Sequence, residues 1–197
     1  MSAPHNCTAC SLCNTRTQVV NGIVVGDNPQ LLVIGEGPGV MEDSKGQPFV
    51  GPTGALLKQE LGIRGIHSYA LSNATRCYPG EDKSDKAMRE ALEACNTYLL
   101  QDIAALQPKV ILVLGAWAVR SLGFDDPMQT ILAHVLEFQG IPAVVSYHPA
   151  AFMRDTGSLH LFELAVYKVM RLLNDLSVGR EWPPQLISMQ EFDAGRN

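Results

Sequence analysis

The sequence has no excess of basic residues, which limits the ways in which it can bind nucleic acid. Its 15 lysines and arginines stand against 20 aspartates and glutamates, which gives a formal net charge of −5. A chain of this charge has no overall positive field to attract DNA. Any contact with DNA must therefore come from a local patch of the surface.

Long apolar runs and a signal peptide are also missing. The longest apolar run, residues 110–119, is interrupted by Gly115 and is far too short to span a bilayer. The first residues, from Met1 to Asn6, contain no basic start and no apolar stretch, which argues against a secretory signal. We therefore expect a soluble, cytoplasmic protein that does not bind membranes.

Length and composition are those of one globular unit. The chain has 197 residues, of which 46% are hydrophobic, enough to bury one core. No internal repeat or low-complexity tract divides it. We expect a single domain over residues 1–197, with a cysteine-bearing segment at its N-terminus and a loose tail from about residue 177.

Apolar segments that read as strands alternate with segments that read as helices. The pattern predicts strands at residues 31–35, 67–73, 110–115 and 143–147, and helices at residues 54–61, 85–106, 116–122 and 159–176. Residues 110–115 are almost continuously apolar, as in a strand that is covered on both faces. This alternation predicts an α/β fold with a central four-stranded parallel sheet and helices on both faces.

A glycine-rich turn follows the first of these strands and carries acidic residues. The turn reads Gly-Glu-Gly-Pro-Gly over residues 35–39, and Glu42, Asp43 and the aromatic Phe49 follow it. The spacing does not match a dinucleotide-binding fingerprint, and no Gly-Lys-Ser/Thr follows to make a Walker loop. The turn is compatible either with solvated acids on a tight loop or with a site at the end of a strand.

Polar residues also follow the other predicted strands. Glu36, Asn73, Gly115 and His148 each lie at the carboxyl end of a different strand. In a parallel sheet these ends share one edge, so residues far apart in the sequence can meet there. The sequence therefore favours an active cleft at this edge over a set of unrelated loops.

The cysteines favour a metal site over disulfides. Five cysteines lie at positions 7, 10, 13, 77 and 95, and Cys7 and Cys10 form a Cys-x-x-Cys pair. Cys77 and Cys95 can complete a set of four thiolates, which suits either zinc or an iron–sulfur cluster. Cys95 also falls on the apolar face of its helix and can be a plain core residue, and Cys13 can replace either neighbour as a ligand.

Taken in order, these motifs resemble those of the family-four, iron–sulfur uracil-DNA glycosylases from Cys7 to about Arg154. The resemblance rests on Cys-x-x-Cys at residues 7–10, the turn at residues 35–39 with Glu42 and Asp43, Gly-Gln-Pro-Phe-Val-Gly at residues 46–51, Ser72-Asn73 leading to Cys77, Cys95, and His-Pro-Ala at residues 148–150.

This resemblance implies roles for individual residues. It implies that uracil is flipped out of DNA and cleaved from its sugar by water, leaving an abasic site. Phe49 would stack on the flipped base near Gly37, Asn73 would bind its pairing edge, and Glu42 would fill the space beside C5. His148 would donate to uracil O2, and Glu36 would orient the water or stabilise the cationic sugar.

The resemblance also implies a [4Fe–4S] cluster and a DNA wedge. The cluster ligands would be Cys7, Cys10, Cys77 and Cys95. In the loop after His148, Phe152 or Met153 would enter the gap left by the flipped base, and Arg154 would bind a phosphate. We expect a monomer acting on single- or double-stranded DNA.

Two alternatives and one partner remain open at this stage. The first alternative is a non-catalytic homologue that binds DNA or a partner. It rests on the acidic net charge and on the stretch Leu-Ala-His-Val at residues 132–135, which departs from the family pattern. A glycosylase for another deaminated or modified base is the second alternative. The tail, with Trp182 and Phe192, can either contact a sliding clamp or form a simple chain end.

Overall fold

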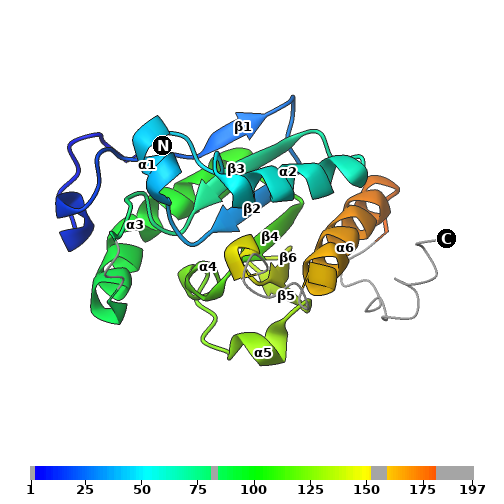
Figure 1. Cartoon of the computed structure of the whole chain (residues 1–197). Helices are drawn as coiled ribbons and strands as arrows, with labels where there is room; N and C mark the ends of the chain where they lie inside the picture. Colours follow the sequence, from blue (N-terminus) through cyan, green and yellow to red (C-terminus); the bar gives the residue numbers. More distant parts are fainter. Residues whose placement is uncertain (1–2, 81–83, 152–158, 181–197) are drawn as a thin grey trace.

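A computed structural model describes residues 3–80, 84–151 and 159–180 of the chain (Figure 1). Its centre is a sheet of six strands in the order β1-β3-β2-β4-β6-β5. The strands are β1 (Ile23–Val25), β2 (Leu31–Gly35), β3 (Tyr69–Asn73), β4 (Val110–Leu114), β5 (Val135–Phe138) and β6 (Ile141–Ser146). The helices are α1 (Val40–Lys45), α2 (Pro52–Ile63), α3 (Asp85–Leu106), α4 (Ala116–Ser121), α5 (Met128–Ile131) and α6 (Leu159–Ser177), with 3₁₀ turns at Ser11–Asn14 (η1) and Pro149–Ala151 (η2).

The sheet is mixed, which corrects the expected four-stranded parallel sheet. The four expected strands are present and pair in parallel as β3-β2-β4-β6. In addition, β1 pairs antiparallel with β3 and β5 pairs antiparallel with β6, so each edge carries one more strand. These edge strands have only 3 and 4 residues and are partly exposed, so they lack the continuous apolar run that marks a buried strand.

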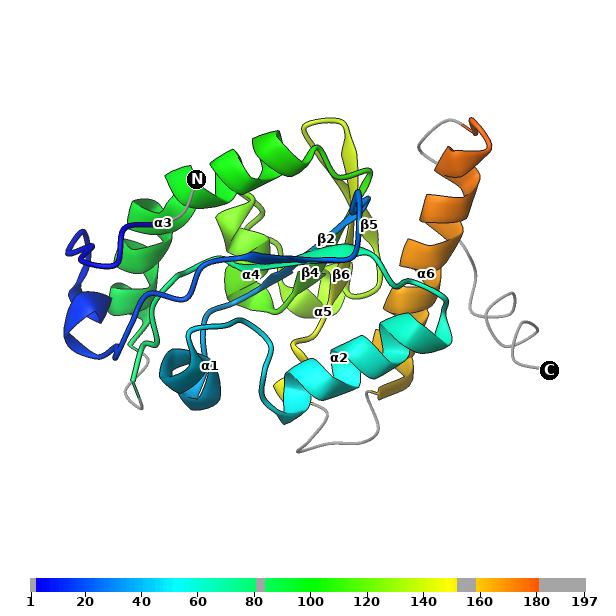
Figure 2. The same cartoon turned by 90° about the horizontal axis from the view of Figure 1, so that it is seen from above.

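Helices cover both faces of the sheet, so each central strand alternates its side chains between two cores. Leu31 and Val33 of β2 face the core that includes α2 and α6, whereas Leu32 and Ile34 face the core that includes α3 and α4. Figure 2 shows α2 and α6 on one side of the sheet and α3 on the other. The strands are therefore buried on both faces, as their near-continuous apolar sequence predicts.

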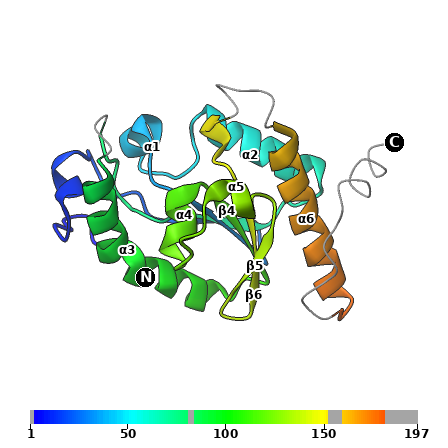
Figure 3. The same cartoon turned by 90° about the horizontal axis from the view of Figure 1, so that it is seen from below.

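The longest helix, α3, also supports the N-terminal segment. Ser84 caps it by accepting a hydrogen bond from the backbone N–H of Ala87 at 3.3 Å, and it ends at Gln107, which has a left-handed φ of 45°, just before Pro108. The N-terminal segment packs beside the start of α3 (Figure 3) in a separate small core that includes Leu12, Met88 and Ala91. This arrangement brings Cys7 and Cys10 of the N-terminal segment next to Cys77.

Two short helices, α1 and α5, were not expected from the sequence. Helix α1 has only 6 residues, between Gly39 and Gly46, and it carries Glu42 and Asp43 into buried positions. Asp43 accepts hydrogen bonds from the backbone N–H of Thr17 at 2.9 and 2.8 Å, so α1 also fixes the N-terminal segment. Among the described helices, none combines the length and the hydropathy that crossing a bilayer would need.

Candidate active site

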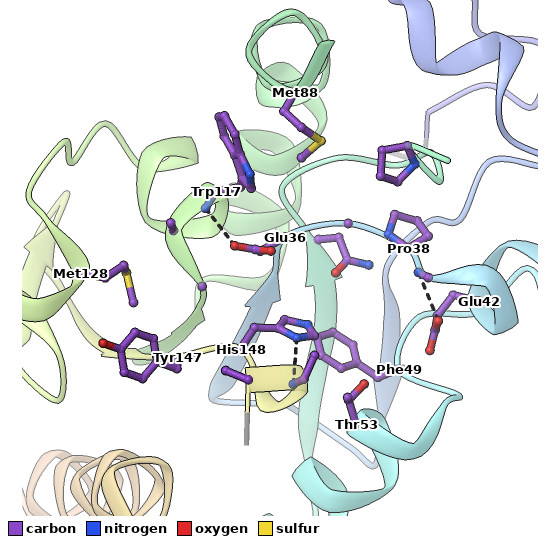
Figure 4. A pocket seen from close by; sticks show the side chains of 18 of the residues that line it. Glu36, Pro38, Glu42, Phe49, Thr53, Met88, Trp117, Met128, Tyr147 and His148 are labelled. Atoms are coloured by element: carbon purple, nitrogen blue, oxygen red, sulfur yellow. Dashed lines mark hydrogen bonds between the residues drawn. The ribbon is translucent and has the colours of Figure 1, made fainter. Parts of the chain in front are cut away.

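A cavity of about 620 Å³ opens at the carboxyl ends of the parallel strands (Figure 4). Its lining comes from the turn after β2, the end of β3, the β4–α4 junction and the segment after β6. The expected site residues that line it are Glu36, Gly37, Glu42, Phe49, Asn73 and His148. The fold thus brings to one cavity residues that are more than 100 positions apart in the sequence.

Glu36 is held by backbone groups at the floor of this cavity. The backbone N–H of Trp117, at the start of α4, donates to its Oε1 at 3.2 Å. Its carbonyl oxygen accepts from the backbone N–H of Thr75 at 3.1 Å. Gly115 has a φ of +96°, and a Cβ built there would lie 2.5 Å from Oε1 of Glu36. The carboxylate therefore has a fixed position that depends on a glycine at position 115.

Asn73 is the most enclosed polar residue of the cavity. It is 3% exposed, and a Cβ at Gly35 on the neighbouring strand would lie 2.5 Å from its Oδ1. After β3, the backbone N–H groups of Ala74 and Thr75 donate to the carbonyl oxygens of Gly35 and Glu36. The Asn73 side chain takes no part in these hydrogen bonds. No described residue forms a hydrogen bond with the side-chain amide of Asn73, which lines the cavity.

Glu42 fixes the loop that carries Phe49. Its Oε1 accepts from the backbone N–H groups of Val50 and Gly51 at 2.9 and 2.8 Å, and its Oε2 accepts from that of Gly39 at 3.1 Å. Phe49 is 5% exposed and has a left-handed φ of 54°, which is strained for a residue with a Cβ. Glu42 therefore stabilises an unfavourable backbone conformation that places an aromatic ring in the cavity.

His148 enters the cavity from the segment after β6. Its Nδ1 accepts a hydrogen bond from the backbone N–H of Ala150, with 3.3 Å between the nitrogens. An Nδ1 that accepts a hydrogen bond does not itself carry a proton, so in the neutral ring the proton lies on Nε2. The imidazole is thereby prepared to donate from Nε2.

The other wall of the cavity was not expected from the sequence. Pro79, Met88, Trp117, Met128 and Tyr147 also line it, and Figure 4 places Trp117, Met88 and Met128 across Glu36 from Phe49. The position of Trp117 directly after a strand end was a signal that could have marked it. The expected wedge residues Phe152, Met153 and Arg154, and the tail with Trp182 and Phe192, lie outside the described residues.

The cysteines gather behind this wall, at the start of α3. Cys7, Cys10 and Cys77 share one packed core with Met88, and Cys95 is buried on the same helix. The pKa of Cys77 is raised to about 11, chiefly by burial and in addition by nearby Cys95 and Cys10, against a lowering by Arg16. Burial likewise raises the pKa of Cys10 and that of Cys95. The four thiols thus lie near enough to one another for their charges to interact.

Arg16 and Cys13 lie at the border of this group. One nitrogen of Arg16 donates to Sγ of Cys77 at 3.2 Å, and another donates to the carbonyl oxygen of Cys7 at 2.6 Å. Cys13 donates from its Sγ to Oδ1 of the adjacent Asn14 at 3.6 Å. Arg16 therefore joins two of the four expected ligands, whereas the thiol of Cys13 bonds to its neighbour.

Comparison with known proteins identifies the family. The model of the family described as "Uracil DNA glycosylase superfamily" matches residues 23–170. The chain belongs to the uracil-DNA glycosylase superfamily. Type-4 uracil-DNA glycosylases are among its relatives: that of Thermotoga maritima is 34% identical, over 76% of this chain and 79% of the relative, and that of Archaeoglobus fulgidus is 32% identical, over 75% and 78%. A third, from Pyrobaculum aerophilum, is 30% identical over 76% and 80%.

The cysteine group offers four thiols as a donor set. Among residues 3–80, 84–151 and 159–180, no group of three or more His, Cys, Asp or Glu side chains is arranged to hold one metal ion. A [4Fe–4S] cluster is held by four cysteine thiolates. Four neighbouring thiols, three of them buried and that of Cys7 partly exposed, agree with that donor set in number and chemistry, and a guanidinium lies beside one of them.

Proposed function

We propose that this member of the superfamily is a monofunctional glycosylase that removes uracil from DNA and leaves an abasic site, the first step of base excision repair. The observation that carries the proposal is Asn73, whose side-chain amide lines the cavity and has no hydrogen-bond partner among the described residues. An amide that faces a cavity without a protein partner can be satisfied by a ligand there. Uracil satisfies it, because Oδ1 accepts from N3–H while Nδ2 donates to O4.

The neighbouring residues complete a site for a flat pyrimidine. Phe49 offers an aromatic ring for stacking, and Gly37 lines the cavity at the turn after β2. The carbon chain of Glu42 limits the space beside C5, where thymine has a methyl group, while its oxygens stay bonded to the loop. Reaching this site requires the base to leave the helix, since the glycosidic carbon is inaccessible in a stacked duplex.

The reaction breaks the bond between N1 of uracil and C1′ of the sugar. The bonding electrons leave with the base, and water adds to C1′ and loses a proton, giving uracil and a C1′ hydroxyl. His148 donates from Nε2 to O2, where negative charge grows only as the bond breaks, so it favours the transition state over the bound substrate. The fixed carboxylate of Glu36 orients the water or stabilises the cationic sugar.

A [4Fe–4S] cluster held by Cys7, Cys10, Cys77 and Cys95 completes this proposal. When bound, it supplies a covalent connection between the N-terminal segment, the loop after β3 and α3. Met88 and Trp117 pack against the cysteine core and also line the cavity, so the cluster supports one wall of the site. We further propose that the chain acts as one domain and as a monomer.

Release of free uracil from oligonucleotides tests this function. Single- and double-stranded substrates with one uracil should both give free base and an alkali-sensitive abasic site, and the His148→Ala variant should be slower by about 10²-fold or more. A panel with thymine, hypoxanthine, xanthine and 5-substituted uracils in the same position defines the base specificity. DNA binding without base release from any substrate would instead favour a non-catalytic homologue, and release of another base alone would favour a different specificity.

A further inference from the structure

The cavity is larger than the proposed base site and extends to a second wall, which is lined by Trp117 and two methionines. Phe49 and His148 lie on one side of Glu36, whereas Trp117, Met88 and Met128 lie on the other (Figure 4). A volume of about 620 Å³ is in the range that accommodates drug-sized ligands, not only one pyrimidine ring. The wall around Trp117 therefore remains available once a uracil occupies the first half.

Trp117 and Arg120 form a stacked pair on this wall. The guanidinium carbon of Arg120 lies 4.7 Å from the centre of the Trp117 ring, on the next turn of α4. Both side chains are partly buried, and the described residues include no carboxylate in an ion pair with Arg120. The pair thus presents an indole to the cavity beside a cation that has no acidic partner within the described chain.

We propose that Trp117 and Arg120 form a subsite for the nucleotide next to the flipped uridine in the same strand. The base of that nucleotide contacts the indole, and its phosphate is neutralised by the guanidinium. This subsite rests on the proposed function, because its position is defined by continuity with the uracil site across Glu36. Aromatic side chains bind bases of single strands without regard to sequence, and arginine beside them binds the backbone.

The subsite also explains how an acidic protein can hold DNA. With a net charge of −5, the chain cannot rely on a general positive field. Stacking does not depend on net charge, and Arg120, which forms no ion pair with a described carboxylate, supplies a local contact beside Trp117. The backbone N–H of Trp117 donates a hydrogen bond to Oε1 of Glu36 at 3.2 Å, which fixes the position of this subsite relative to the carboxylate.

A double-mutant cycle between protein and DNA tests the proposal. Wild-type protein and Trp117→Leu are compared on single-stranded oligonucleotides with uracil flanked either by normal nucleotides or by an abasic analogue on the 5′ or the 3′ side. We expect loss of one flanking base to lower kcat/KM of the wild type by roughly 5- to 100-fold. On the normal substrate, kcat/KM of Trp117→Leu should be lower than that of the wild type by the same factor. On the substrate with the abasic neighbour, kcat/KM of Trp117→Leu should fall no further.

Control variants separate this contact from general support of the fold. Trp117→Phe should keep most of the dependence on the flanking base, and Met128→Leu, on the same wall, should keep all of it. Arg120→Gln should weaken DNA binding and reduce the slope of log Kd against log salt by about 1. Equal losses of Trp117→Leu on normal and abasic substrates would show that the tryptophan only packs against the core, and would overturn the proposal.

A second measurement does not depend on catalysis. In a Trp182→Phe variant, Trp117 is the only tryptophan of the chain, and its fluorescence should be quenched by single-stranded DNA but less by DNA with the abasic neighbour. Unchanged fluorescence at DNA concentrations that saturate binding, followed by anisotropy of labelled DNA, would also overturn the subsite. Quenching by DNA in a protein that releases no uracil would instead contradict the proposed function and leave the subsite in place.

Discussion

The carboxylate of Glu36 occupies the space that a Cβ of residue 115 would need. The distance from that built Cβ to Oε1 is 2.5 Å, and the distances to Cδ and Cγ are both 2.7 Å. Since Gly115 directly follows β4 and Glu36 directly follows β2, the contact depends on the pairing of these two parallel strands. A glycine that is distant in sequence thus determines where the acid can lie.

Replacing Gly115 should therefore impair activity more than stability. We expect Gly115→Ala to displace Glu36 and to lower kcat for uracil release by about tenfold or more. The matched control is Gly123→Ala, because Gly123 has a similar φ of +85° but no atom within 4 Å of its built Cβ. Both variants carry the backbone strain of about 1–3 kcal/mol, measurable by denaturant unfolding. Equal kcat in the two variants would show that the position of Glu36 is not required.

Asn73→Asp tests the proposed pairing with uracil. The carboxylate no longer donates to O4, so we expect most uracil excision to be lost, by at least tenfold, since an unpaired buried group is worth about 1–3 kcal/mol. A protonated aspartic acid donates to N3 of cytosine and accepts from its 4-amino group, so slow cytosine release should appear and increase at lower pH. Asn28→Asp, at an exposed turn, is the control. Normal uracil release by a folded Asn73→Asp protein would contradict the assignment.

Substitutions of Glu42 test whether this residue excludes substituents at C5 of the base or supports the loop that carries Phe49. Removal of its carboxylate leaves three backbone N–H groups without their acceptor, so Glu42→Ala should lower the free energy of unfolding by at least about 2 kcal/mol. Uracil release should fall with it, because Phe49 loses its fixed position. The free energy of unfolding of Glu42→Gln should lie between those of the wild type and Glu42→Ala, since one amide oxygen can still accept from the loop. Glu93→Ala on the exposed face of α3 provides the control.

The two roles of Glu42 give opposite results on 5-substituted bases. A simple guard predicts normal uracil release and new release of thymine or 5-substituted uracils by Glu42→Ala. A support predicts lower activity on every base and a lower thermal midpoint. Normal stability together with new thymine release would refute the loop-supporting role.

Arg16 should determine how well the proposed cluster is retained. Wild-type protein purified without oxygen should be brown and contain iron and sulfide, whereas Cys77→Ala and Cys95→Ala should lose both. Arg16→Ala removes the hydrogen bonds to Cys77 and Cys7, so we expect its colour to bleach several-fold faster in air. Arg89→Ala, an exposed arginine of α3, should bleach as the wild type does. Zinc without iron in anaerobic wild-type protein would exclude the cluster itself.

Lys168 should give the stability of the protein a distinct pH dependence. It is 8% exposed, it donates to the carbonyl oxygen of Ala133 at 2.8 Å, and burial lowers its pKa from the ordinary value of 10.5. At pH values between the folded and the unfolded pKa, the unfolded chain holds a proton that the folded chain has released. The free energy of unfolding then rises with pH.

Comparison with Lys168→Met isolates this contribution. As the pH rises from 7 toward 10.5, the wild type should gain stability relative to Lys168→Met. Urea unfolding at several pH values measures the difference, with Lys109→Met as an exposed control. A difference that stays constant or shrinks with rising pH would contradict a lowered pKa. Ala133 belongs to the stretch at residues 132–135 that departs from the family pattern, so Lys168 supports the backbone there.

The sequence by itself determined the parallel core of the fold and the residues at its carboxyl edge. Val110–Leu114 and Leu31–Gly35 were predictable because strands buried on both faces must be almost wholly apolar. Helix α3 was predictable over its full length, since its apolar residues repeat at helical spacing between a serine cap and a proline. The placement of Glu36, Asn73 and His148 after strands followed from these same patterns.

Tertiary structure decided what local patterns cannot encode. The edge strands β1 and β5 owe their conformation to pairing with β3 and β6, because 3 or 4 partly exposed residues have little preference of their own. The left-handed backbone of Phe49 and the support of its loop by Glu42 depend on hydrogen bonds across the turn. The second wall of the cavity, with Trp117 stacked on Arg120, exists only because α3 and α4 pack side by side on the sheet. Contacts between distant segments fix these features, whereas the alternation of apolar residues fixes the elements themselves.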